Sequence, residues 1–169
     1  MKVYIDSDVF VSYVRKTEKN HKNSKKFLDF IIKNNLKDVN FFTSRFTEVE
    51  VGSAIYRRTK RQDRARATLH KMTRSWANKI FPLPENPNKK IKIDNLIIKL
   101  VETALKYGTR FGDSIHANDV ESYDIDYLVT WNIKDFKKLE KKIKKLTVLE
   151  PVEILKILKE KCGCKVKGG

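Results

Sequence analysis

The chain has 169 residues, of which 40% are hydrophobic and 34% charged, and this length suits one compact domain. With 6 Gly and 4 Pro it is not a linker-rich chain, and no apolar run approaches the roughly 18 residues that a membrane span needs. The first ten residues, MKVYIDSDVF, are too acidic for a signal peptide. The chain has two Cys, both near the C-terminus, and these are too few for a disulfide framework. We therefore expect a cytoplasmic protein with no membrane segment.

The charge balance is the first positive indication of function. The chain carries 37 Lys and Arg against 21 Asp and Glu, which gives a net charge of +16. Such a charge favours a polyanionic partner, and nucleic acid is the leading candidate. The alternative is a lysine-rich proteome of the thermophile type, but that enrichment usually raises Glu as well.

Short β-rich runs alternate with longer segments of helical spacing along the chain. In chain order, the pattern predicts a strand at 3–5, helices at 7–13 and 24–34, a strand at 39–43 and helix from about 46 to 79. Prolines at 82, 84 and 87 predict a loop, followed by helices at 93–107 and 113–123, a strand at 127–130, a helical segment at 136–146, a strand at 147–149 and a helix at 151–159. The alternation indicates an α/β domain over residues 1–160 with a mainly parallel sheet, and a disordered tail at 161–169.

Acidic residues fall where an α/β fold places its ligands. Asp6 directly follows the first predicted strand, Glu50 lies on the helix after the second, Asp113 opens a helix, and Asp135 follows the third strand with Asn132 between. Ligands of open α/β sheets bind beyond the carboxyl ends of the strands. Clustered carboxylates repel one another, and a hard divalent cation such as Mg²⁺ or Mn²⁺ relieves this repulsion. Such a cation can activate water for attack at phosphorus.

Each of these residues also has a purely structural interpretation. Asp6, Asp8 or Asp113 would serve equally well as a helix cap. His116 lies one turn after Asp113 and so comes near the predicted site, but a lone His on a helix more often packs or faces solvent.

Four segments in chain order resemble the PIN-domain family of metal-dependent ribonucleases, which includes VapC-like toxins. They are V-Y-I-D-S-D-V-F, T-S-R-F-T-E-V-E-V-G-S-A-I, F-G-D-S-I-H-A and Y-L-V-T-W-N-I-K-D-F, and together they cover residues 3–136. The resemblance implies a PIN-like α/β/α fold with a central sheet of about four to five mainly parallel strands, flanked by helices.

The resemblance also implies residue roles. Asp6, Glu50 and Asp113 would be catalytic and would hold metal, and Asp135 and Asn132 would share the fourth position. Many family members carry Asp where this chain has Asn132, and an amide ligand brings no charge.

Three further residues would support the metal ligands. Thr130 and Ser7 would orient a metal-bound water or a carboxylate, and Asp8 would act behind the ligands. Glu48 competes with Glu50, since two residues two apart on a helix cannot point at one site. Glu50 is preferred because E-V-x-x-A-I matches the family better.

The implied function is a Mg²⁺- or Mn²⁺-dependent endoribonuclease that hydrolyses RNA phosphodiester bonds, with a toxin role that would add an antitoxin partner and a homodimer. Four basic residues are predicted to grip the RNA backbone, although they would also suit a solvated helix face: Arg57, Arg58, Arg61 and Arg64. The alternative, motivated by Asn132, is an RNA-binding or RNA-maturation module with weak or no catalysis. A DNA-binding regulator is a third hypothesis, but no recognition-helix motif supports it.

Overall fold

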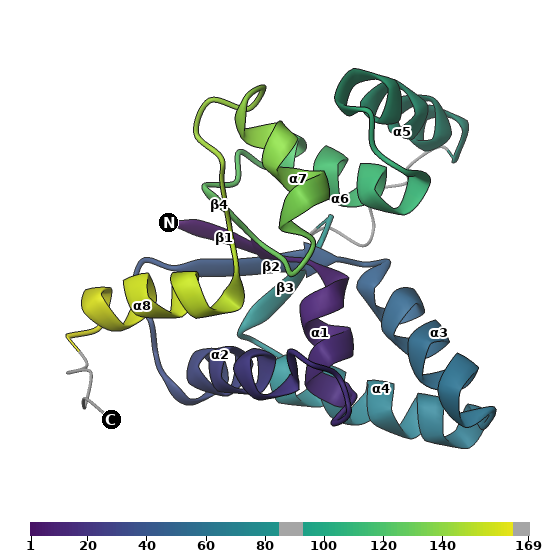
Figure 1. The fold of residues 1–169 in the computed structure, drawn as a ribbon, viewed down its shortest axis with the longest axis vertical. Helices are drawn as coiled ribbons and strands as arrows, with labels where there is room; N and C mark the ends of the chain where they lie inside the picture. The colour runs from purple at the N-terminus through teal and green to yellow at the C-terminus, as the bar shows by residue number, and fades with distance from the viewer. Residues whose placement is uncertain (85–92, 164–169) are drawn as a thin grey trace.

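Five parallel strands run through the centre of the molecule in the order β3-β2-β1-β4-β5 (Figure 1). They are β1 (Lys2–Ile5), β2 (Asn40–Ser44), β3 (Ile80–Leu83), β4 (Tyr127–Val129) and β5 (Thr147–Leu149). The computed structural model describes residues 1–84 and 93–163. The central strand β1 pairs in parallel with β2 on one side and with β4 on the other. The predicted α/β class with a parallel sheet is confirmed.

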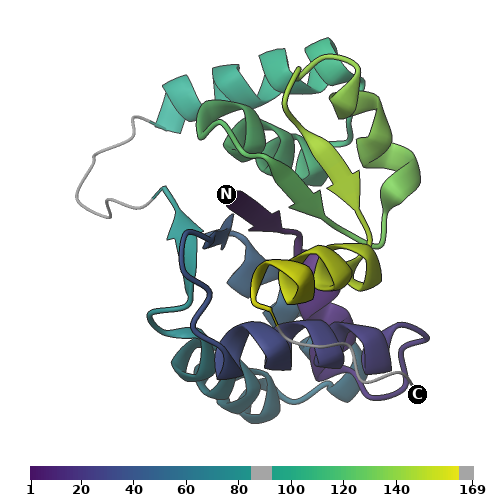
Figure 2. The same ribbon diagram turned by 90° about the vertical axis from the view of Figure 1, so that its left-hand side faces the viewer.

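Helices cover both faces of this sheet (Figures 1 and 2). In the described residues they are α1 (Ser7–Val14), α2 (His21–Lys33), α3 (Thr47–Thr59), α4 (Gln62–Trp76), α5 (Ile93–Tyr107), α6 (Phe111–Ser122), α7 (Ile133–Glu140) and α8 (Pro151–Lys161). Helices α5, α6 and α7 lie on one side, and α1 to α4 with α8 lie on the other. None of them is both long and apolar enough to cross a membrane.

The side chains of the central strand alternate between two cores. Val3 and Ile5 pack with α1 to α4 and α8, whereas Tyr4 packs with α5, α6 and α7. Phe41 and Phe42 of β2 divide in the same way. Because both faces are covered, these strands are apolar at successive positions, as parallel strands usually are.

Parallel pairing brings the carboxyl ends of the strands to one edge of the sheet. The pairing continues one residue past the strands, since the Asp6 amide donates to Val129 at 2.9 Å and the Thr130 amide donates to Leu149 at 3.1 Å. The residues that follow β1 and β4 are therefore held side by side.

The strand β3 corrects the sequence prediction of a loop at the prolines. Residues 80–83 pair with β2, and Pro82 lies opposite Thr43. Proline has no amide hydrogen to donate, but β3 is at the edge of the sheet, where one side of a strand needs no partner. Pro87 lies outside the described residues.

Three predicted boundaries also differ from the structure. The helix predicted from 46 to 79 is two helices, because Lys60 takes a left-handed conformation with φ of 54° and ends α3. The segment predicted to be helical to residue 146 ends at Glu140. Of the tail predicted at 161–169, Lys161 is the last residue of α8, and residues 164–169 lie outside the described part.

Candidate active site

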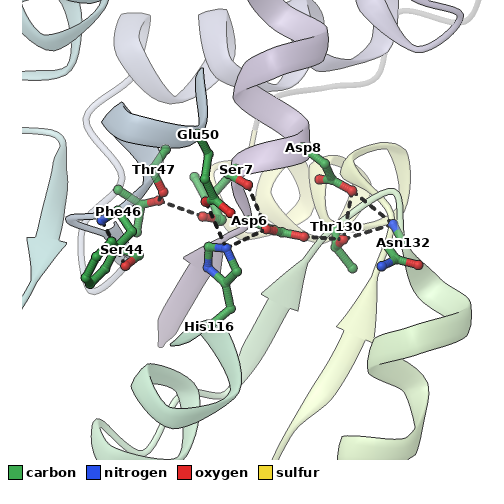
Figure 3. A network of polar contacts seen from close by, with 12 residues as sticks. Asp6, Ser7, Asp8, Ser44, Phe46, Thr47, Glu50, His116, Thr130 and Asn132 are labelled. Atoms are coloured by element: carbon green, nitrogen blue, oxygen red, sulfur yellow. Dashed lines mark hydrogen bonds and ion pairs between the residues drawn. The ribbon is translucent and has the colours of Figure 1, made fainter. Parts of the chain in front are cut away.

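Asp6 lies at the centre of a polar cluster at the carboxyl edge of the sheet (Figure 3). It is the first residue after β1 and only 4% exposed. The Thr130 hydroxyl, in the loop after β4, donates to Asp6 Oδ2 at 2.8 Å, and the Ser7 hydroxyl donates to Oδ1 at 3.3 Å. Two predicted supporting residues thus contact the first predicted ligand and fix both of its oxygens.

Asp8 lies on the other side of Thr130, on the first turn of α1 (Figure 3). Its Oδ2 accepts from the backbone amides of Trp131 and Asn132, at 2.9 and 3.0 Å, and is 3.0 Å from Thr130 Oγ1. Burial raises the pKa of Asp8 well above its ordinary value, and the nearby Asp6 raises it further. Asp8 therefore anchors the loop after β4, while the single Thr130 hydrogen lies between two carboxylates.

Glu50 and His116 meet Asp6 from the opposite side, on α3 and α6. The Nε2 atom of His116 is 3.2 Å from Glu50 Oε2 and 3.2 Å from Asp6 Oδ1. Burial by itself would lower the pKa of His116, but Asp6 and Glu50 raise it to about 9. Burial opposes ionisation of Glu50 as well, yet His116 lowers the pKa of Glu50 overall. Glu48 is exposed, so the structure brings Glu50 and not Glu48 to the cluster.

Two residues that sequence reasoning missed hold His116 from behind. The Tyr4 hydroxyl is 2.8 Å from His116 Nδ1 and donates to Asp119 Oδ2 at 3.2 Å. Asp119 is 7% exposed, and burial raises its pKa to about 6. The sequence does carry a signal for them, because Asp113, His116 and Asp119 recur every three residues and therefore lie along one side of a helix.

The remaining predicted ligands lie at the same edge. Asp113 is on the first turn of α6, where burial raises its pKa and the charges of Asp6 and Asp135 raise it further. The side-chain amide of Asn132 donates to Asp135 Oδ2 at 3.0 Å. The structure thus brings Asp113 into electrostatic contact with Asp6 and with Asp135, and directs the Asn132 amide hydrogen to Asp135.

Helix capping does not account for these carboxylates. Asp6 occupies the N-cap position of α1 but its side chain makes no capping hydrogen bond, and its oxygens bind Thr130 and Ser7 instead. The N-cap of α6 is Arg110, and Asp113 lies inside the helix.

The chemistry of this donor set fits a hard divalent cation. Four carboxylates, those of Asp6, Glu50, Asp113 and Asp135, gather here, and among the interactions described for them the ion pairs are those of His116 with Asp6 and Glu50. Burial raises the pKa of Asp113, the charges of Asp6 and Asp135 raise it further, and the charges of His116 and Arg110 partly oppose this. Within residues 1–84 and 93–163, no three His, Cys, Asp or Glu side chains already surround a metal position. Side-chain rotation would therefore have to accompany metal binding.

A cavity of about 530 Å³ leads away from the cluster between α1 and α3. Asp8 and Glu50 line it, as do Arg15 and Arg57. Each arginine follows its acidic residue by about two helical turns. Glu18 also lines the cavity and pairs with Arg15 at 2.9 Å, so the far end of the cavity carries both charges, with Arg57 on the α3 side.

The four arginines predicted to bind nucleic acid do not all line the same cavity. Arg57 lines the cavity beside Glu50. Arg58 and Arg64 line a second cavity of about 350 Å³ together with Arg15, and Arg58 also donates to Thr17. Arg61 is paired with Asp63 on the surface.

The five-stranded parallel sheet, covered by helices on both faces, defines a small α/β/α domain. No protein-family model matches the sequence, and no curated protein matches it. Among solved structures, VapBC-1 from nontypeable Haemophilus influenzae is similar at a TM-score of 0.57 and 18% identity, over 89% of this chain and 98% of that one. VapBC2 from Rickettsia felis, bound to a DNA fragment from its promoter, is similar at a TM-score of 0.56 and 15% identity, over 89% of this chain and 98% of that one. FitAcB from Neisseria gonorrhoeae is similar at a TM-score of 0.53 and 15% identity, over 88% of this chain and 97% of that one. The chain has the fold of a VapC-like PIN domain.

Proposed function

We propose that this protein is a Mg²⁺- or Mn²⁺-dependent endoribonuclease, and the toxin of a toxin–antitoxin pair. The observation that carries the proposal is the gathering of Asp6, Glu50, Asp113 and Asp135 at the carboxyl edge of a VapC-like sheet. The chain is otherwise strongly basic, at +16, so an acidic cluster inside it requires an electrostatic reason.

Asp6, Glu50 and Asp113 would hold the cation, with Asp135 or the Asn132 carbonyl oxygen as a further ligand. When bound, the cation supplies an activated water and neutralises charge at the phosphorus that is attacked. Thr130 and Ser7 keep the Asp6 oxygens oriented. Asp8 fixes the loop that carries Thr130 and Asn132.

The cavity between α1 and α3 offers a path for the RNA backbone. A phosphate next to the scissile one would reach Arg57, whose guanidinium can bind two phosphate oxygens at once. Arg61 is the matched control, since it lies on the same basic stretch but is already paired with Asp63.

Arg57→Ala should therefore weaken RNA binding and reduce the slope of log K against log salt by about 1, whereas Arg61→Ala should change neither appreciably. Fluorescence anisotropy with a labelled RNA across a salt series measures both quantities. Equal effects of the two substitutions would argue against this path.

The antitoxin partner rests on the similar solved structures, which are VapBC assemblies. A small protein encoded beside this chain should bind it and suppress its ribonuclease activity. Cleavage that continues in the presence of a stably bound partner would contradict the toxin role.

The principal test is cleavage of a structured RNA pool with Mg²⁺, with Mn²⁺ and with EDTA. Asp6→Asn and Glu50→Gln should each reduce the rate at least about 100-fold, because each removes a charge that the cation needs. Glu48→Gln is the matched control on α3 and should leave the rate unchanged, since Glu48 is exposed and away from the cluster.

The same assay distinguishes the alternative function. Asn132 motivates an RNA-binding or RNA-maturation module without efficient cleavage, because its amide hydrogen is directed at Asp135 and it adds no charge. RNA that binds but is not cut with either metal, for a pool that includes transfer and ribosomal RNA, would favour that alternative.

A further inference from the structure

His116 is placed as a ligand would be, although it is not among the residues expected to hold metal. Its ring is 2% exposed, and its Nε2 is 3.2 Å from both Asp6 Oδ1 and Glu50 Oε2 (Figure 3). Neighbouring ligands of an octahedral ion with bonds near 2.1 Å are separated by about 3.0 Å. The distances from Nε2 to each carboxylate oxygen are therefore close to the separation of adjacent metal ligands, although the three side chains do not yet surround a metal position.

The other ring nitrogen is held as in known metal-binding histidines. Tyr4 has one hydroxyl hydrogen, and it donates this hydrogen to Asp119. Its oxygen is then left to accept from Nδ1–H of His116, at 2.8 Å. Tyr4 and the carboxylate of Asp119 behind it hold the hydrogen on Nδ1 and direct Nε2 forward, which is the usual support of a metal-bound imidazole.

Packing also prevents the ring from turning away. The ring of Tyr4 meets it edge-on at 5.8 Å between centroids, and the ring of Phe136 does so at 6.4 Å. Both aromatic residues are fully buried. The Nε2 atom is thus committed to the side where Asp6 and Glu50 lie.

We propose that His116 Nε2 is a direct ligand of the divalent cation held by Asp6 and Glu50, and that this nitrogen makes the site prefer Mn²⁺ to Mg²⁺. An ion bound there replaces the hydrogen on Nε2, which leaves to solvent. Imidazole suits transition metals, whereas Mg²⁺ prefers oxygen ligands. The inference deepens the proposed metal-dependent function and rests on it.

The test is pulsed electron paramagnetic resonance of Mn²⁺ added below one equivalent to the full chain. Protein grown with ¹⁵N-histidine should show the nuclear modulation of a directly bound ¹⁵N, and unlabelled protein that of ¹⁴N. The signal should disappear in His116→Gln and persist in a variant in which the other two histidines, His21 and His70, are changed to Gln. The isotope comparison needs no substitution, so a variant that fails to fold does not obscure it.

Calorimetric titration gives a second, independent readout. His116→Gln should weaken Mn²⁺ binding about tenfold or more and leave Mg²⁺ binding within about threefold, and Tyr4→Phe should weaken Mn²⁺ binding by about tenfold through the orientation of His116. Bound Mn²⁺ without histidine nitrogen modulation would overturn this inference and leave the carboxylate metal site intact. If no Mn²⁺ binds at all, both the inference and the proposed metal dependence are wrong.

Discussion

Asp119 is a carboxylate enclosed behind the candidate active site, facing Tyr4, Ser44, Asn118 and His116. Burial raises its pKa to about 6 from an ordinary value of 3.8. The folded protein therefore binds more protons than the unfolded chain between about pH 4 and 6, and its free energy of unfolding falls as pH rises through that window. The free energy of unfolding that is lost across this window because of Asp119 is of the order of 3 kcal/mol.

Asp119→Asn should remove this part of the pH dependence. Urea unfolding in EDTA at several values from pH 4 to 7 measures it, and the difference between variant and wild type should grow in favour of the variant as pH rises. Other carboxyl groups titrate in the same range, so only the difference between the two proteins is diagnostic. Parallel curves would mean that Asp119 is ionised in the same range when folded and unfolded.

Thr130 is the fully buried hydroxyl between Asp6 and Asp8. Thr130→Val keeps the shape but leaves both carboxylates without this donor, and should lower the free energy of unfolding by about 1–3 kcal/mol. Thr130→Ser keeps the hydroxyl and should retain most of the stability. Equal losses of stability in Thr130→Val and Thr130→Ser would mean that the hydroxyl contacts with Asp6 and Asp8 are not the main cause of the effect.

Among the residues of the polar cluster, sequence patterns predict the places of Asp6 and Thr130 but not the contacts of His116. Asp6 and Thr130 are predictable because each follows an apolar strand directly, and parallel strands end at one edge. The contacts of His116 with Asp6 and Glu50 depend on how closely α6 packs over the Tyr4 face of β1, and that distance is set by the whole core rather than by local pattern.

The junction of α3 and α4 is the clearest feature at the scale of elements. Lys60 has φ of 54° and its amide donates to Tyr56 at 2.8 Å, so a residue with a side chain ends the helix in the left-handed region. Lys60→Gly should raise the free energy of unfolding by about 0.5–1 kcal/mol, since relief of strain exceeds the added entropy of the unfolded chain. Chemical denaturation checks this, with Lys60→Ala as a control that should change little. A destabilised glycine variant would contradict it.

The elements that the sequence predicts well are those in which one pattern dominates. The strands β1 and β4 are short apolar runs ended by a polar residue, and α8 begins with a proline and a capping box formed by Glu150 and Glu153. The strand β3 is missed because it contains Pro82 and an exposed Phe81, both consequences of its place at the edge of the sheet. The position of β3 at the edge is set by how all five strands assemble, so residues 80–83 alone do not predict it.

The whole molecule presents an apolar face that its own core does not cover. The exposed apolar side chains on and beside α5 are Ile97, Ile98, Val101, Leu105 and Phe111, from 50% to 80% exposed. On α8, by contrast, Ile154 and Leu158 are buried in the core and Leu155 and Ile157 pack against it. Contiguous apolar surface of this kind usually marks an interface, and the homodimer expected from sequence would use it.

Leu105→Glu should therefore shift the protein toward the monomer and weaken self-association about tenfold or more, because a charge would be buried in the contact. Light scattering behind size exclusion measures the mass. Val152→Glu, a similar change on α8 where the side chain is 36% exposed, is the control and should leave the mass unchanged. If wild type is monomeric at all concentrations tested, this face does not form a dimer.

The pairing of β1 with β4 also governs when the site can exist during synthesis. Asp6 is made well before the hydroxyl that orients it, which belongs to a residue 124 positions later. At about 5–20 residues per second, the ribosome delivers that partner roughly 6 to 25 seconds after Asp6. A nascent or prematurely terminated chain that stops before β4 lacks the pairing of β1 with β4, and it also lacks Asp135. A cell translating this message is therefore exposed to the assembled acidic cluster only after β4 and Asp135 have been made.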